Sequence, residues 1–185
     1  MPIRLSIVVV SFILSQVAFV FAQAEVYTTA IGKVRFLSQS ALEEIHAESK
    51  QLSGLLNVTN NNFVFAVRIA SFEGFNLSLQ REHFNENYLE SEKYPLATFQ
   101  GRVIDSYDFD NTASCVVRAK GLLKIHGQEQ EKIIKVQLTK KGNTIFITSN
   151  FSVLLEDYEI KIPRIVHGKI AQSVAVEVKA DLVRK

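Results

Sequence analysis

The alternation of apolar and polar residues along most of the chain is the feature that most limits its fold. From residue 31 onward apolar side chains recur at every second position, as at Phe63, Phe65 and Val67. Successive side chains of a strand point to opposite faces, so each such run has one apolar and one mostly polar side. A helix would spread the same residues around its circumference. The pattern predicts strands near residues 31–39, 43–50, 52–58, 62–71, 97–106, 113–126, 130–141, 143–154 and 172–183.

Polar turn segments separate these runs and indicate how the strands are connected. Residues 60–62, 108–111, 127–129 and 141–143 are rich in Asn, Asp and Gly, which tolerate tight turns. Short connections favour antiparallel neighbours, and closure into a barrel removes the free edges of such a meander. We therefore predict an all-β fold, an antiparallel lipocalin-like barrel of eight strands or nearly so, wide enough for one elongated ligand.

Two segments interrupt the alternation. Residues 76–92 predict a short helix around 78–85, with Asn76 or Ser78 as its N-cap. This helix lies between two predicted strands, where it can cap the mouth of the barrel, and Tyr94-Pro95 ends it. The second irregular segment, 155–171, predicts a half-strand followed by a crossover.

The N-terminus has the pattern of a secretory signal peptide. Arg4 is the one charge before an uncharged run from Leu5 to Phe21, and small residues at Ala22 and Ala24 follow. We predict a signal peptide at 1–24 and one domain at 25–185, periplasmic or secreted, with no stable membrane span after cleavage. The alternative is an uncleaved membrane anchor, for which the apolar run is at the lower limit of length.

Charge and residue spacing disfavour several classes of function. Removal of the leader lowers the formal net charge from +2 to +1, and the basic residues are scattered, so nucleic-acid binding is disfavoured. The four histidines show no metal-site spacing, and Cys115 is the single cysteine, so we expect no metal. No nucleophile or phosphate-loop signature is present, and we expect no catalytic residue and no cofactor.

Two motifs resemble those of a known family. Arg81-Glu82-His83-Phe84, followed by Tyr88, Ser91, Tyr94-Pro95 and Phe99, resembles the helix and Tyr-Pro step of the YceI-like family of periplasmic polyisoprenoid-binding proteins. The segment 121–127 is similar to that family's glycine-leucine strand. The resemblance implies a lipocalin-like barrel that encloses an isoprenoid chain, in an exported protein.

We accordingly predict a binding or carrier protein for an isoprenoid lipid, a quinone or a polyprenyl chain, with no enzyme activity. Arg81 and His83 are candidate contacts to the lipid head group, and the long final strand is compatible with a homodimer. Two alternatives stay open: a barrel enzyme acting on an apolar substrate, and a filled barrel serving as a structural or interaction module. The predicted cavity wall consists of Phe36, Phe63, Phe65, Val67, Phe84, Tyr88, Phe99, Val117, Leu123, Ile134, Val136, Ile147, Phe151 and Val176.

Overall fold

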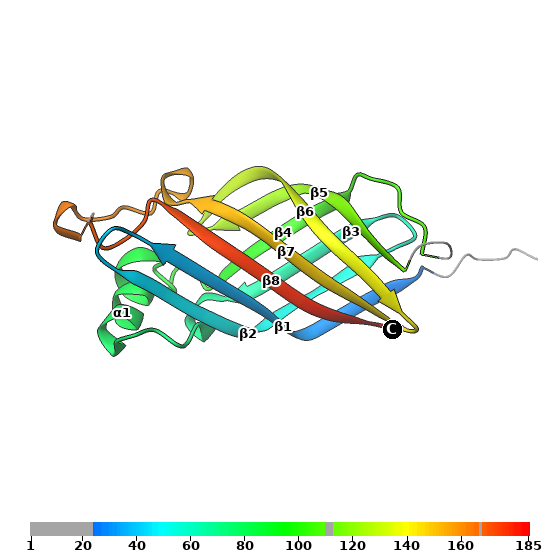
Figure 1. Ribbon diagram of the computed structural model, residues 1–185, viewed down its shortest axis with the longest axis horizontal. Coiled ribbons are helices and arrows are strands. Elements are labelled where there is room, and N and C mark those ends of the chain that lie inside the picture. Colours follow the sequence, from blue (N-terminus) through cyan, green and yellow to red (C-terminus); the bar gives the residue numbers. More distant parts are fainter. Residues whose placement is uncertain (1–23, 110–112, 167) are drawn as a thin grey trace, which may run out of the picture.

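The chain forms a closed antiparallel β-barrel of eight strands in the order in which they occur in the sequence (Figure 1). This computed structural model describes residues 24–109, 113–166 and 168–185. The strands are β1 (Val26–Gln39), β2 (Glu44–Asn57), β3 (Asn62–Arg68), β4 (Leu96–Val103), β5 (Ser114–Ile125), β6 (Gln128–Lys141), β7 (Thr144–Leu154) and β8 (Ser173–Arg184). Pairing of β1 with β8 closes the barrel, so the described residues contain the complete hydrogen-bonded ladder. The predicted fold class is confirmed.

The first two strands are longer than predicted because each contains an irregularity. The predicted strands 43–50 and 52–58 are one strand, β2, and β1 begins at Val26 rather than at residue 31. The pairing register shifts between Gly32 and Val34, which face Leu52 and Ser49, and again between Thr29 and Gly32. At each shift one of the two strands contains an extra residue, which reverses the positions along that strand that face the barrel interior. The alternation therefore breaks in the sequence although the strand continues.

The capping helix is confirmed, with different ends. α1 (Ser78–His83) continues into a wider π-type turn at Phe84–Tyr88. Its N-cap is Leu77, not Asn76 or Ser78, and the Leu77 N–H donates to Gln80 Oε1 at 3.3 Å. The Asn76 side chain instead donates to the carbonyl oxygen of Glu44 at 2.8 Å, which ties the start of the helix to β2.

The remaining differences lie at strand ends. β3 ends at Arg68 and a single 3-10 turn (Ile69–Ser71) follows, whereas we predicted a strand to residue 71. β4 likewise ends at Val103 rather than 106. The predicted half-strand within 155–171 is wrong, because this connection contains two short 3-10 helices, Leu155–Tyr158 and Arg164–Val166.

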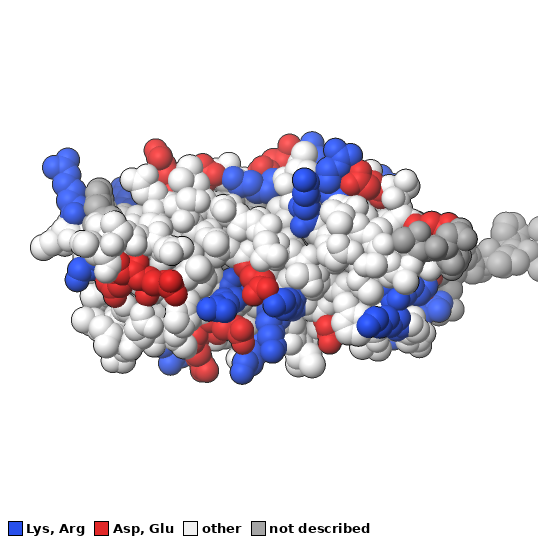
Figure 2. Space-filling view, in the orientation of Figure 1, with Lys and Arg blue, Asp and Glu red and all other residues white. Residues whose placement is uncertain are grey.

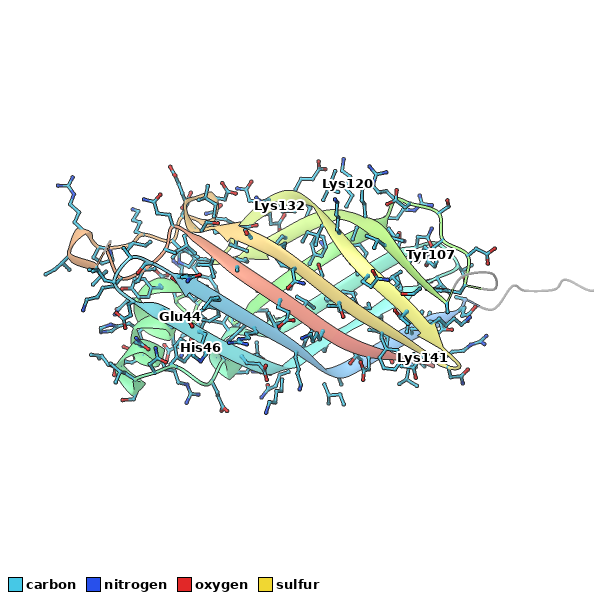
Figure 3. All side chains as sticks on the ribbon, viewed as in Figure 1. Glu44, His46, Tyr107, Lys120, Lys132 and Lys141 are labelled. Carbon is cyan, nitrogen blue, oxygen red and sulfur yellow. The ribbon has the colours of Figure 1, made fainter. Side chains whose placement is uncertain are left out.

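One end of the barrel is filled with side chains. Tyr27, Ile145 and Leu182 are at most 1% exposed there, beneath the loop that carries Tyr107 and Phe109. The rings of Tyr107 and Phe109 lie 4.9 Å apart between centroids. The C-terminus lies at this packed end, and α1 lies at the opposite end (Figure 1). Figure 3 shows the same separation, with Tyr107 near the packed end and Glu44 near α1.

The predicted leader, residues 1–24, lies almost wholly outside the described residues, so its cleavage stays a prediction. His167 lies outside them too. Within the described ranges no helix is long and apolar enough to cross a membrane.

Candidate ligand cavity

An apolar cavity of about 480 Å³ lies inside the barrel and reaches the mouth beside α1. All of the residues predicted to form the cavity wall line it. The volume is within the range of sites that hold a small molecule, roughly 300–1,000 Å³. The interior is therefore not filled along its whole length: side chains pack the end around Tyr27, Ile145 and Leu182, and the cavity lies between that end and α1.

The strand register explains why the wall residues meet. Val117 on β5 pairs with Val136 on β6, and Phe151 on β7 pairs with Val176 on β8. Val176 also pairs with Phe36 on β1, across the seam that closes the barrel. Residues directly opposite one another in a pair share a face, so inward positions of adjacent strands form continuous bands of apolar side chains.

An aromatic cluster attaches the capping helix to this wall. The ring of Phe84 lies 5.7 Å from that of Phe72 and 5.2 Å from that of Phe75, measured between centroids. Phe36 on β1 contacts the same group, 5.6 Å from Phe72. Phe72 and Phe75 line the cavity but were absent from the predicted wall, because they follow β3 in a segment without strand periodicity.

Polar side chains line the cavity mainly at its rim. Gln80 Nε2 donates to Glu43 Oε1 at 2.5 Å, which joins α1 to the β1–β2 turn. Lys169 and His83 also line the cavity at this end. His83 thus lies at the mouth, and its contact with a lipid head group stays a prediction. Arg81, the other candidate, is exposed on α1 and is not among the lining residues.

Below the rim the described lining residues are almost entirely apolar. Ser149 is an exception, and its hydroxyl donates to the carbonyl oxygen of Lys135 at 2.8 Å. Tyr88 lies beneath the cap, and burial raises the pKa of its phenol. The titratable side chains of this lining, Glu43, His83, Tyr88 and Lys169, all belong to the cap or to the loops of the mouth. The arrangement suits enclosure of an apolar molecule, with polar contacts at one end.

The connection between β7 and β8 contributes lining residues that the sequence reading missed. Ile160, Ile162, Val166 and Ile170 close one side of the mouth. The spacing of Ile160 and Ile162 is strand-like, but Pro163 and the short 3-10 helix that follows it remove any continuous pattern. No cluster of three or more potential metal ligands occurs in the part of the chain that the structure describes.

A closed antiparallel barrel with an apolar cavity beneath a short cap defines a lipocalin-like binding protein. The YceI-like domain family matches residues 15–182, and the chain belongs to that family. A comparison with curated protein sequences gives no significant match.

Solved structures with the same fold differ widely from this chain in sequence. A polyisoprenoid-binding domain from Saccharophagus degradans is 14% identical, with a TM-score of 0.73 over 88% of this chain and 100% of that one. BcnA from Burkholderia cenocepacia is also 14% identical, with a TM-score of 0.67 over 82% and 96% of the two chains. YceI from Campylobacter jejuni is 14% identical, with a TM-score of 0.57 over 74% and 82%. At this identity the likeness establishes the fold.

Proposed function

We propose that the protein is an exported carrier that holds an isoprenoid lipid, a quinone or a polyprenyl chain, inside the barrel. The observation that carries the proposal is the apolar cavity of about 480 Å³ with ionisable side chains confined to its mouth. The solved structure of a polyisoprenoid-binding domain with the same fold supports the choice of ligand class.

The physical basis of binding is removal of the lipid tail from water. Each buried methylene contributes about 0.8 kcal/mol, so an isoprene unit contributes roughly 2–3 kcal/mol before the cost of ordering the tail. The tail would lie along the wall to which all eight strands contribute side chains. The head group would lie at the rim near Glu43, His83 and Lys169.

The decisive experiment is solvent extraction of the protein purified without detergent, followed by mass spectrometry. We expect one isoprenoid species in near-stoichiometric amount. A matched preparation of Val117→Phe, whose new ring projects into the cavity, should contain much less of it. An extract without isoprenoid, from protein that also fails to bind one added in solution, would refute the proposal.

Export rests on residues 1–24 and needs a separate measurement. The intact mass of protein isolated from the periplasm or medium should correspond to an N-terminus near Gln23 or Glu25. Recovery of the full-length chain from the membrane fraction would show an anchor instead. Homodimer formation also stays a prediction, and it would be tested by light scattering of the same material.

A further inference from the structure

The mouth of the cavity is surrounded by exposed apolar side chains from three separate segments. Ile165, in the β7–β8 connection, is 91% exposed, and Leu42, in the β1–β2 turn, is 74% exposed. Leu77 and Leu79, at the start of α1, are 61% and 53% exposed and also line the cavity. The apolar interior therefore continues through Leu77 and Leu79 to the outer surface.

Hydrogen bonds join these segments into one rim. The Leu42 N–H donates to the carbonyl oxygen of Gly168 at 3.1 Å, and the Ser40 hydroxyl donates to the same oxygen at 2.9 Å. On the other side of the β1–β2 turn, the Gln80 side chain donates to Glu43. The exposed leucines and Ile165 thus belong to a connected surface at the end of the barrel opposite the C-terminus (Figure 1).

Basic side chains accompany the apolar ones in the β7–β8 connection. Lys161, Arg164 and Lys169 are exposed, and none of them forms an ion pair within the described ranges. On the barrel wall, by contrast, Lys120 pairs with Glu131 at 3.2 Å and Lys124 with Glu129 at 3.1 Å. Figure 2 shows Lys and Arg side chains that project from the α1 end of the molecule, together with a patch of Asp and Glu side chains.

Acidic side chains at this end of the barrel lie outside residues 160–170. Glu43 and Glu44 lie at the β1–β2 turn, Glu82 and Glu86 on α1 and its extension, and Glu156 and Glu159 at the start of the β7–β8 connection. Residues 160–170, by contrast, contain Lys161, Arg164 and Lys169 and no carboxylate. The positive charge is therefore local to the residues around Ile165, in the segment that extends furthest beyond the strands (Figure 1). Exposed apolar side chains flanked by Lys and Arg are the pattern of proteins that bind the interface of an anionic bilayer.

We propose that this rim docks on the surface of an anionic lipid bilayer and places the mouth of the cavity against the membrane. Ile165, Leu42, Leu77 and Leu79 enter the headgroup–acyl boundary, while Lys161 and Arg164 contact lipid phosphates. The proposal deepens the proposed function and rests on it, because docking gives an isoprenoid tail an apolar path between bilayer and cavity. Contact with water, which opposes transfer of a long tail, is then avoided.

The test is sedimentation with vesicles of phosphatidylcholine alone or with added phosphatidylglycerol, using residues 24–185, which contain the complete barrel ladder. We expect binding to the anionic vesicles. Ile165→Asp should weaken it at least tenfold, and Lys161→Gln with Arg164→Gln about twentyfold, since each basic residue near an anionic surface contributes about fivefold. Ile133→Asp is the matched control, because Ile133 is 57% exposed on the barrel wall, and it should bind like the unmodified protein.

Two results would overturn the docking proposal: no binding to anionic vesicles, or equal binding of Ile165→Asp and Ile133→Asp. Retention of an isoprenoid added in vesicle-free solution is measured in parallel on the same variants. A protein that retains the isoprenoid but does not bind vesicles refutes docking alone. A protein that retains none refutes the proposed function, whatever its binding to vesicles.

Discussion

The ring of Phe84 in the cap stacks on the ring of Phe36 in β1, with centroids 5.3 Å apart and planes inclined by 13°. The barrel ladder does not include α1, so side-chain contacts of this kind, together with the hydrogen bonds of Asn76 and Gln80, hold the cap on the mouth. Offset or tilted aromatic pairs contribute roughly 0.5–1.5 kcal/mol beyond the area they bury. Phe84 therefore fixes the position of the cap.

Replacement of Phe84 with alanine should loosen the cap while the barrel stays folded. Phe84 is half-buried, so we expect a loss of about 2 kcal/mol of unfolding free energy, below the 3–5 typical of a buried Phe. Ligand dissociation, followed by stopped-flow fluorescence of a labelled isoprenoid, should accelerate about tenfold. Phe146→Ala, on the exposed face of β7, is the control and should leave dissociation unchanged. Equal rates in the two variants would show that the cap does not retain the ligand.

The cavity wall can be tested at two adjacent positions on one strand. Val117 is 1% exposed and lines the cavity, whereas Val116 is 61% exposed on the outer face of β5. Val117→Phe should reduce affinity for a long isoprenoid by at least tenfold, because the added ring occupies space that the tail needs. Overpacking costs typically 1–3 kcal/mol, so thermal unfolding is measured alongside. Val116→Phe should alter neither property, and full-strength binding by a folded Val117→Phe variant would place the ligand elsewhere.

Tail length should determine affinity more than the head group does. In a titration series of isoprenoids with one head group, affinity should increase with each added unit and level off when the cavity is full. Lys169→Ala and Arg81→Ala should each shift the curve modestly, by about 1 kcal/mol or less at a solvated rim, with the larger effect at Lys169, which lines the cavity. Affinity independent of length, with complete loss in Lys169→Ala, would show instead that the head group is the recognised feature.

Tyr158 should contribute to loss of stability at high pH. It is fully buried, and burial, with the nearby Asp157 carboxylate, raises the pKa of its phenol from 10.0 to about 12. Between pH 10 and pH 12 the unfolded chain ionises this group and the folded chain does not. Stability therefore falls with rising pH, by at most about 1.4 kcal/mol per pH unit from this group.

Among the described residues the Tyr158 hydroxyl has no hydrogen-bond partner, so Tyr158→Phe should be nearly neutral at pH 8. The same variant should lose less stability than the unmodified protein between pH 8 and pH 11, as measured by urea midpoints. Tyr27→Phe provides a contrast, because the Tyr27 hydroxyl donates to Glu25 Oε1 at 2.8 Å and its removal should cost stability already at pH 8. If Tyr158→Phe and the unmodified protein lost the same stability between pH 8 and pH 11, ionisation of Tyr158 would not be the cause of the loss.

Phe84 and Tyr88 belong to the cap, but alternation is sufficient to predict the barrel and the wall residues that lie on strands, because both depend on which face of a strand a residue occupies. It failed where the backbone departs from that geometry. At the register shift near Leu52 the alternation breaks, so the sequence predicts two strands where there is one. Beyond Pro163 the rim residues Ile165 and Val166 lie in a 3-10 helix and show no strand alternation. The position of Lys169 at the mouth depends on contacts such as that between Leu42 and Gly168, which are distant in the sequence.

The packed end of the barrel, around Tyr27, Ile145 and Leu182, holds the strands together without taking part in the cavity. Exposed residues at the mouth, such as Arg164 and Ile165, are consequently free to change with little penalty to folding. New ligand preferences can arise in such a molecule through substitutions in α1 and the β7–β8 connection. Selection for a stable protein and selection for a particular cargo then act on different residues of the same barrel.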